Sequence, residues 1–573
     1  MLKRNHEAIS PSAVAGLPAL LLLLAVAAAG TSPAFAATLG VDDSSSTGAV
    51  GDARLSLSEA IRLAGGLLSP LVLSEAERAR IDSEPGASSA DLIRVELGEG
   101  AILTTPAGAA FGLPVLFGNE GDVLDGGGAI LRAAGALPPG AIGLFTVSSK
   151  LEIRRFSFDG YPFGIIVAAA PGAADLEDIR ISENGFSDYE IGVVVVPNFN
   201  GSKGLRGLLI DRNRFVAEVE ATGAIVVLGA LPQAPGEVAS DYLIEDVVIR
   251  ENEIEGGFGG IAVFGGQARP GTTVRDGRLD GLRIVGNDIR GVYDLSITVY
   301  AGFAFFGGAI SGIEVSDVRI ARNRIATVGT PSSHIWAVSG NSFNEPGGIV
   351  ENNVLRDIAI VGNTTSGGGD CILGIQLQAS QNELGGGIVR GNLLERVWVF
   401  GNSVSGCGNG LGVFGAVAAA GHGLVEGNEL RQVRLFGNRL TDNTRGVVVD
   451  GAVGLEESAL PLPSPEPALI RQNLVHSIDV FGNRVRGGIT GIVAIGGVSN
   501  FTSDAVVGNL VSDAREFGNF VRGAQFRCIV IDDLVRGDEG GTATDNRADF
   551  ECSEADPGFS RRVRSAEADA RVE

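Results

Sequence analysis

The stretch Asp357-Ile-Ala-Ile-Val-Gly-Asn363 decides the fold, because near copies of it recur along most of the chain. Two of the copies are Arg396-Val-Trp-Val-Phe-Gly-Asn402 and Gln432-Val-Arg-Leu-Phe-Gly-Asn438. Successive motifs end on asparagines that lie 29 to 45 residues apart. A constant motif with uneven spacing is typical of a solenoid with constant strands and variable loops. The asparagines are Asn184, Asn213, Asn252, Asn287, Asn323, Asn363, Asn402, Asn438, Asn483 and Asn519.

Each motif alternates with a period of two residues. The positions five and three residues before the asparagine are nearly always apolar, as Val433 and Leu435 are before Asn438, and the residue between them is often polar. This alternation predicts a strand with one buried face. A second strand follows each bend, as in Gly446-Val-Val-Val-Asp450, and a further asparagine precedes five of the motifs by ten residues. We therefore predict an all-β parallel solenoid with three strands and two bends per coil.

About 10–12 such coils fit between residue 93 and residue 552. Equivalent residues of neighbouring coils should lie about 4.8 Å apart along the axis. Asparagine tolerates the bend conformation, and its amide both donates and accepts hydrogen bonds. We therefore expect the asparagines from Asn323 to Asn519 to stack as a structural ladder.

Composition limits the function classes. The chain has 573 residues, and its 45% of hydrophobic residues excludes disorder as the overall state. The 85 glycines do not fall at every third position, which excludes collagen. The formal net charge of −24 makes the chain a poor general binder of DNA or RNA.

The first 36 residues have the pattern of a secretory signal peptide. Lys3 and Arg4 precede the apolar run Leu17–Gly30, and Ala34-Phe35-Ala36 fits a cleavage site. We expect an exported chain, extracellular or periplasmic, with no transmembrane segment after cleavage. An uncleaved signal anchor is the alternative, although fourteen residues are short for a membrane span.

The four cysteines favour disulfides, because an even number in an exported protein is typical of paired cysteines. We favour the pairs Cys371–Cys407 and Cys528–Cys552, and four free cysteines remain open. Their spacing does not resemble that of a zinc site.

The expected boundaries divide the chain into four parts. Residues 37–92 form an N-terminal cap region, in which Leu55–Ala64 has helical spacing and a Ser56-x-x-Glu59 capping box. A short helix is expected at Glu75–Ile81. Residues 93–552 form the solenoid. Residues 553–573 form a charged, disordered tail.

The pattern resembles the right-handed parallel β-helix proteins of the pectin-lyase-like superfamily. The asparagine-ended motifs, the segment Leu124-Asp-Gly-Gly-Gly-Ala-Ile-Leu131 and the cap element Leu57-Ser-Glu-Ala-Ile61 carry the resemblance. It implies a fold and no specific activity, because members include polysaccharide lyases, polygalacturonases, esterases, phage tailspikes and adhesins.

Two fragments resemble the polygalacturonases, which hydrolyse with paired aspartates and a nearby histidine. The fragments are Gly369-Asp-Cys-Ile372 and Gly421-His-Gly-Leu424. Asp370 and His422 are 52 residues apart, which is one coil plus nearly half a turn, so they should lie on different faces. The paired aspartate is also single here, so the catalytic residues stay unknown.

Cation binding has one weak local candidate. Lyases of the superfamily use Ca²⁺ held by acidic residues, and Asp532, Asp533 and Asp538 form the best acidic group of this chain. The alternative, which we favour, is a solvated loop at the C-terminal cap. We therefore expect neither a metal nor a cofactor.

Arginines recur on the outer row of the first strand and again after the asparagines. Stacked, they would form a positive stripe that holds an anionic polymer. We favour the alternative of a solvated face balanced by neighbouring carboxylates. The arginines are Arg180, Arg283, Arg319, Arg434, Arg515, Arg214, Arg324, Arg439 and Arg484.

A phenylalanine stands two residues before the asparagine in four consecutive coils, and Trp398 lies beside the first. If the side chains point outward, they form a contact surface for sugars or a protein. If the bend turns them inward, they form an interior stack. We favour an interior stack or packing under a loop. The four residues are Phe400, Phe436, Phe481 and Phe517.

These observations lead to one function hypothesis and two alternatives. We expect the chain to bind extracellular polysaccharide or a cell-surface partner along a sheet face, and we identify no catalytic site in the sequence. The alternatives are a polysaccharide lyase or glycoside hydrolase, and a structural or adhesive surface protein. The sequence leaves the ligand and the oligomeric state open.

Overall fold

The computed structural model describes residues 37–45, 50–83, 85, 90–113, 121–169, 175–199, 203–217, 221–305, 307–327, 332–343, 347–383, 387–419, 423–455, 469–499, 505–535, 542–552 and 560–563. The expected signal peptide, His422 and Asp538 lie outside these residues, and so does the side chain of Asp370. No helix among the described residues is long and apolar enough to cross a membrane.

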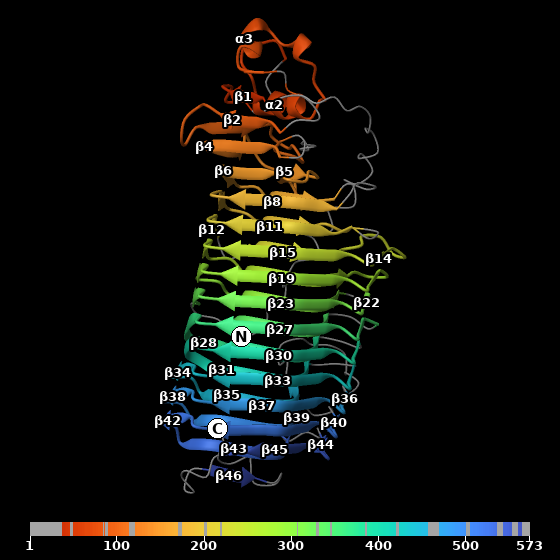
Figure 1. The fold of residues 1–573 in the computed structure, drawn as a ribbon, viewed down its shortest axis with the longest axis vertical. Coiled ribbons are helices and arrows are strands. Elements are labelled where there is room, and N and C mark those ends of the chain that lie inside the picture. Colours follow the sequence, from red (N-terminus) through yellow and green to blue (C-terminus); the bar gives the residue numbers. More distant parts are fainter. Residues whose placement is uncertain are drawn as a thin grey trace. The chain divides into compact units, whose positions relative to one another are not determined.

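The chain forms two compact units, and each is built from stacked parallel strands (Figure 1). The N-terminal unit comprises the described residues from Ala37 to Leu228 and Leu243–Ile261. The C-terminal unit comprises Gly229–Tyr242 and the described residues from Ala262 to Val563. Strand β17 (Gly259–Ala268) contains a boundary between them. Both units are sections of parallel β-helix, as the repeat predicts.

The N-terminal unit has three strands per coil. Its sheet 1 stacks β6 (Glu152–Asp159), β8 (Leu176–Ser182), β11 (Leu205–Asp211) and β15 (Leu243–Arg250). Its sheet 2 stacks β9 (Gly185–Ser187), β12 (Arg214–Val216) and β16 (Glu253–Glu255). Its sheet 3 stacks β5 (Ile142–Thr146), β7 (Phe163–Ala168), β10 (Ile191–Val196) and β13 (Gly223–Leu228).

Four strands precede these three stacks, and the predicted cap helix contacts the first two of them. They are β1 (Thr38–Val41), β2 (Leu92–Val95), β3 (Ile102–Thr105) and β4 (Val123–Ala133). Helix α2 (Leu57–Ala64) contacts β1 and β2, and its capping box is confirmed, since Glu59 N–H donates to Ser56 Oγ and Ser56 N–H donates to the Glu59 carboxylate. A 3₁₀ turn, η3 (Pro70–Val72), precedes α3 (Glu75–Arg78), the second expected helix.

The C-terminal unit has four strands per coil, one more than the repeat predicts. Sheet 1 stacks β19 (Arg278–Val285), β23 (Glu314–Ala321), β27 (Val354–Val361), β30 (Leu393–Phe400), β33 (Glu429–Phe436), β37 (Leu474–Phe481), β41 (Leu510–Phe517) and β45 (Arg547–Glu551). Sheet 2 stacks β20 (Asp288–Arg290), β24 (Arg324–Ala326), the first residues of β28 (Thr364–Glu383) and β31 (Ser403–Ala419), then β34 (Arg439–Thr441), β38 (Arg484–Arg486) and β42 (Phe520–Arg522).

Sheet 3 of this unit stacks β21 (Leu295–Phe305), β25 (Ser332–Phe343), the later residues of β28 and β31, then β35 (Arg445–Leu455), β39 (Thr490–Ser499), β43 (Phe526–Val535) and β46 (Ser560–Val563). Sheet 4 stacks β14 (Val238–Ser240), β18 (Thr273–Arg275), β22 (Ala309–Ser311), β26 (Ile349–Glu351), β29 (Ile388–Arg390), β32 (Leu424–Glu426), β36 (Leu469–Arg471), β40 (Ala505–Val507) and β44 (Thr542–Thr544).

Strand β46 falls inside the tail that we expected to be disordered; it pairs with β43, whose backbone would otherwise be an open edge.

Two columns of buried asparagines mark the bends of the C-terminal unit. In each column, the backbone N–H and the side-chain Nδ2 of one asparagine donate to Oδ1 of the next at 2.8–3.0 Å. The bend backbone groups are thereby satisfied without water. The first column contains Asn287, Asn323, Asn363, Asn402, Asn438, Asn483 and Asn519, and the second contains Asn353, Asn392, Asn428, Asn473, Asn509 and Asn546.

The N-terminal unit has one column, in which Asn184 donates to Asn213 and Asn213 donates to Asn252. The coil from Asn184 to Asn213 spans 29 residues, against 36 in three coils of the C-terminal unit. The seven additional residues suffice for a three-residue strand and a second asparagine bend. Coil length therefore accompanies the change from three strands to four.

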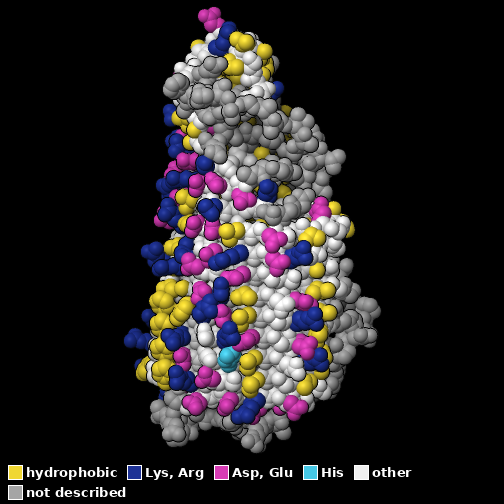
Figure 2. All heavy atoms as spheres, turned by 45° about the vertical axis from the view of Figure 1, so that its right-hand side comes forward, with side chains coloured by type: hydrophobic (Ala, Val, Ile, Leu, Met, Phe, Trp, Pro, Cys, Tyr) yellow, Lys and Arg dark blue, Asp and Glu magenta, His cyan; other side chains and the backbone are white. Residues whose placement is uncertain are grey.

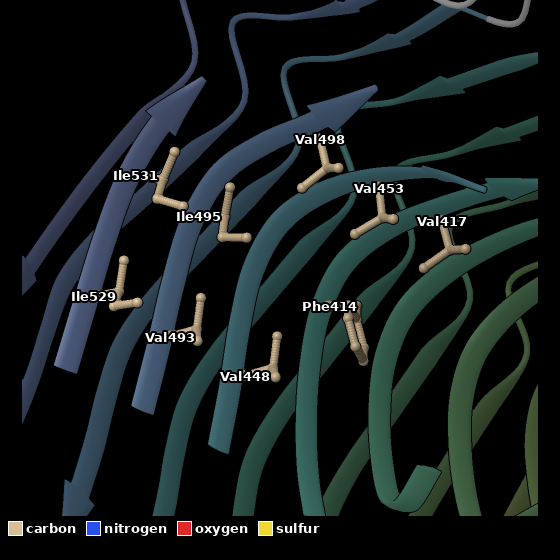
Figure 3. Packing of buried hydrophobic residues seen from close by; sticks show 9 residues of the cluster. All are labelled: Phe414, Val417, Val448, Val453, Val493, Ile495, Val498, Ile529 and Ile531. Carbon is tan, nitrogen blue, oxygen red and sulfur yellow. The ribbon is translucent and has the colours of Figure 1, made fainter. Parts of the chain in front are cut away.

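Both favoured disulfides, Cys371–Cys407 and Cys528–Cys552, are present. Nine buried apolar residues form a cluster on one side of β31, β35, β39 and β43 (Figure 3). Residues at intervening positions, such as Val447 and Val449, point to the opposite side of the same strands. The cluster comprises Phe414, Val417, Val448, Val453, Val493, Ile495, Val498, Ile529 and Ile531.

Candidate functional site

The four phenylalanines of the repeat form a continuous stack on the outer side of sheet 1. Successive rings from Phe400 to Phe517 have centroids 4.9, 5.1 and 5.0 Å apart and planes within 10° of one another. Phe400, Phe436 and Phe481 are partly exposed, and Phe517 is 43% exposed. An interior position of the rings is therefore wrong, while packing under a loop stays a prediction.

The cause is the alternation of the strand itself. Val433 and Leu435 are buried inside the coil, so Phe436, one residue further, points outward. The bend begins only after the phenylalanine, at a glycine in the left-handed region, with φ of 67°, 63°, 63° and 62° at Gly401, Gly437, Gly482 and Gly518. The bend therefore does not change the side on which the rings lie.

The stack exposes ring edges. Because the rings cover one another's faces, only their peripheries remain open between Phe400 and Phe517. The edge of an aromatic ring carries the positive end of its quadrupole. The column therefore offers an apolar strip with a weakly electropositive rim.

A row of polar side chains runs beside the stack on the same strands. Trp398 is aligned with Arg434, Arg434 with Asp479, and Asp479 with Arg515. Asp479 lies between the two arginines, 3.7 Å from Arg434 Nε and 2.8 Å from Arg515 Nε. The hydrogen bond between Arg515 and Asp479 raises the pKa of Arg515. The Arg515 guanidinium lies 5.6 Å from the centroid of the Phe517 ring. One carboxylate thus partly neutralises this row.

Most other arginines of the predicted rows are balanced in the same way. On sheet 1, Arg396 bonds Asp357, Arg431 bonds Glu395, and Arg283 pairs with Asp317. Arg319, which is aligned with Arg283, is the exception: it is exposed and has no ion-pair partner among the described residues. In the N-terminal unit, Arg180 lies near Glu152 and Asp211, and Arg214, on sheet 2, lies near Glu253. Figure 2 shows basic and acidic side chains interspersed over the face that it presents. On sheet 1 the balanced alternative is therefore the better description of the arginines.

Sheet 2 of the last coils is different. Arg439 is aligned with Arg484, and Arg486 with Arg522, so like charges occupy neighbouring strands. All four side chains are exposed, and none of them forms an ion pair with another described residue. Like charges at this spacing repel each other unless a counter-charge lies nearby. This set, the sheet 2 arginines, is a basic patch that has no ion-pair partner among the described residues, on a chain that is acidic overall.

The sheet 2 arginines and the phenylalanine stack flank the same bends. Phe436 and Arg439 lie on either side of Asn438, and Phe481 and Arg484 lie on either side of Asn483. Phe520, which directly follows the bend at Asn519 and is aligned with Arg484, is 62% exposed. The sequence analysis predicted Arg439 and Arg484 as candidates but missed Arg486, Arg522 and Phe520. Their signal was available, since they stand at fixed offsets of one to three residues after Asn483 and Asn519.

The weak cation candidates have structural roles. Asp533 Oδ1 accepts hydrogen bonds from the backbone N–H and Nδ2 of Asn546, at 3.0 and 2.8 Å. It thus occupies the place of the next asparagine in the second column. Asp532 Oδ1 accepts from the backbone N–H of Ala548. Oxygens held in this way cap the end of the coil stack.

No protein-family model and no curated protein matches the sequence. A solved complex structure of an alginate lyase matches 61% of this chain and 81% of the lyase chain, at 11% identity and a TM-score of 0.12. A likeness of this size carries no functional argument. The relation to the pectin-lyase-like proteins stays a resemblance that rests on the repeat and the parallel β-helix.

Proposed function

We propose that this protein is exported and binds an anionic polysaccharide along the bends of its last four coils. The observation that carries the proposal is the exposed phenylalanine stack beside the sheet 2 arginines. The phenylalanines repeat once per coil and the arginines recur in the last three of these coils, so both features suit a ligand that is itself linear and repetitive. The two disulfides agree with an oxidising compartment.

Charge favours an anionic ligand. Arginine forms charge-assisted, two-pronged hydrogen bonds with carboxylate and sulfate groups. The electropositive ring edges of the stack favour the same sign. The overall charge of −24 opposes long-range attraction of a polyanion, so contact should depend on the local patch and should be sensitive to salt.

The test is affinity electrophoresis of the full exported chain in gels that contain polygalacturonate or alginate, with neutral dextran as the uncharged comparison. The wild-type chain should be retarded by at least one polyuronate and not by dextran. Arg439→Gln with Arg484→Gln should weaken binding about thirtyfold, since each of the two lost hydrogen bonds is worth about 1 kcal/mol. Phe436→Ala with Phe481→Ala should weaken it by a similar factor.

The matched control is Arg206→Gln. Arg206 is exposed, lies in the N-terminal unit and is bonded to Glu245 at 2.8 Å, so its loss should leave retardation unchanged. Equal retardation of the control and the double arginine variant would contradict the proposed site. The absence of retardation by both polyuronates would contradict the function itself. New unsaturated uronate ends in the same incubations would instead indicate a lyase.

A further inference from the structure

Three side chains from successive coils meet inside the C-terminal unit. His334 lies on β25, Cys371 on β28 and Cys407 on β31, and these strands are consecutive in sheet 3. His334 Nδ1 lies 3.8 Å from Cys371 Sγ and 3.7 Å from Cys407 Sγ. The three residues are 0%, 4% and 3% exposed. The proposed binding function uses none of them.

The other ring nitrogen of His334 is held by a hydroxyl group. Thr327 Oγ1 lies 3.0 Å from His334 Nε2. When Nε2–H donates to this oxygen, Nδ1 carries a lone pair that faces the two sulfurs. A neutral imidazole oriented by a hydrogen bond on its far nitrogen is the form that binds metal ions.

We propose that, when the Cys371–Cys407 disulfide is reduced, His334, Cys371 and Cys407 form a binding site for a soft or borderline divalent ion such as Zn²⁺. Two thiolates and an imidazole are the ligands that such ions prefer. Within the part of the chain that the structure describes, no other group of three His, Cys, Asp or Glu side chains is close enough to hold an ion.

The present distances already match most of such a site. Zn–S and Zn–N bonds of about 2.3 and 2.0 Å at tetrahedral angles place nitrogen and sulfur about 3.6 Å apart, and two sulfurs about 3.8 Å apart. The two N–S distances, 3.7 and 3.8 Å, are close to this value. Only the two sulfurs, about 2.0 Å apart in a disulfide, must separate. Rotation about each Cα–Cβ bond permits that separation once the S–S bond is broken.

Reduction of the disulfide followed by binding of the ion balances in electrons, protons and charge. A dithiol reductant such as dithiothreitol transfers two electrons and two protons to the disulfide, and is itself oxidised to a cyclic disulfide. The two cysteines then lose two protons to solvent as the divalent ion binds. Two thiolates and the ion have no net charge, which limits the penalty of placing charges in this buried site. The disulfide and the metal site are therefore alternative states of the same residues.

The second disulfide supplies an internal control, because the described structure places no histidine beside Cys528 and Cys552. The test uses the full chain with Cys528→Ser and Cys552→Ser, reduced with dithiothreitol, freed of reductant without oxygen, and titrated with Co²⁺. We expect one equivalent to bind with a thiolate-to-cobalt charge-transfer band, and no band in the oxidised protein. His334→Gln should weaken binding at least about tenfold.

Thr327→Val offers a second variant that keeps all three ligands. It removes the hydroxyl at Nε2 and should weaken Co²⁺ binding while leaving the far-ultraviolet circular dichroism of the reduced chain unchanged. Three results would overturn the proposal. These are loss of the β-sheet signal on reduction alone, equal Co²⁺ binding by oxidised and reduced protein, and unchanged affinity in the His334→Gln variant.

Discussion

The two units of this protein each contain a stack of phenylalanines. One stack faces the interior of its coils, and the other faces outward. In the N-terminal unit, Phe158, Phe186 and Phe215 stack inside the coil, with centroids 5.3 and 4.6 Å apart and exposures of 2% or less. In the C-terminal unit, the stack from Phe400 to Phe517 lies outside. The same residue in the same kind of column thus fills a core in one unit and forms a surface in the other.

The position relative to the asparagine decides the side. Phe186 and Phe215 stand two residues after Asn184 and Asn213, where the chain has passed the bend and points inward. Phe436 stands two residues before Asn438 and points outward. A stack of rings is therefore no evidence of a core until its place in the coil is known.

The interior stack requires space on the strand that faces it. A Cβ atom on Gly164 would lie 2.5 Å from the Phe186 ring, and one on Gly192 would lie 2.5 Å from the Phe215 ring. Distances this short exclude any side chain at either glycine. In the C-terminal unit the corresponding interior positions after the asparagine carry smaller residues, such as Val404, Leu440 and Val485.

The largest expected effect is in the N-terminal unit. Phe186→Ala should lower the free energy of unfolding by about 3–5 kcal/mol, because it leaves a cavity between two stacked rings. Urea denaturation followed by circular dichroism measures the change. Phe186→Leu, which refills part of the cavity, should recover a substantial share. A loss below about 1 kcal/mol for the alanine variant would contradict the interior stack.

A smaller effect is expected beside the outer stack, at the inward-pointing Asn438. Asn438→Ala removes the acceptor of the Asn402 side chain and backbone N–H, and the donor to Val399 O. Each buried group left without a partner costs about 1–3 kcal/mol, so a total near 3 kcal/mol is expected. The neighbouring exposed Arg439→Ala should change the same urea transition by about 0.5 kcal/mol or less. Similar values for the two variants would show that the column adds little to stability.

The smallest effect is expected for the outer stack itself. Phe436→Ala loses contacts with Phe400 and Phe481 but leaves no closed cavity, so about 1 kcal/mol should be lost. The same denaturation assay applies, with Phe186→Ala measured in parallel. If Phe436→Ala proved as destabilising as Phe186→Ala, the outer stack would have to be covered in solution, and the proposed binding surface would not exist.

Much of the fold followed from the repeat. The period-two alternation around Val433 and Leu435 predicted the strands, and the asparagine spacing predicted the coils. The capping box at Ser56 and Glu59 predicted helix α2. The fourth strand of the C-terminal coils, such as Arg439–Thr441, was missed, because three residues between two bends are too few to show a period.

The candidate site was predicted only in part. The sequence located the phenylalanines and several arginines but favoured the wrong side for Phe436. It left open which arginines are balanced. Asp479 neutralises Arg434 and Arg515 from neighbouring coils, 45 and 36 residues away. The sheet 2 arginines have no such neighbour among the described residues, and only the aligned strands show that.

The sequence by itself determined the winding of the chain, since a motif that recurs in every coil must place its apolar and asparagine positions in columns. The tertiary structure alone decided which columns face solvent and which residues from distant coils meet. His334 contacts Cys371 and Cys407, which lie 37 and 73 residues further along the chain. Stacking brings such positions together at the spacing of neighbouring strands, and the lengths of the intervening loops set which residues are aligned.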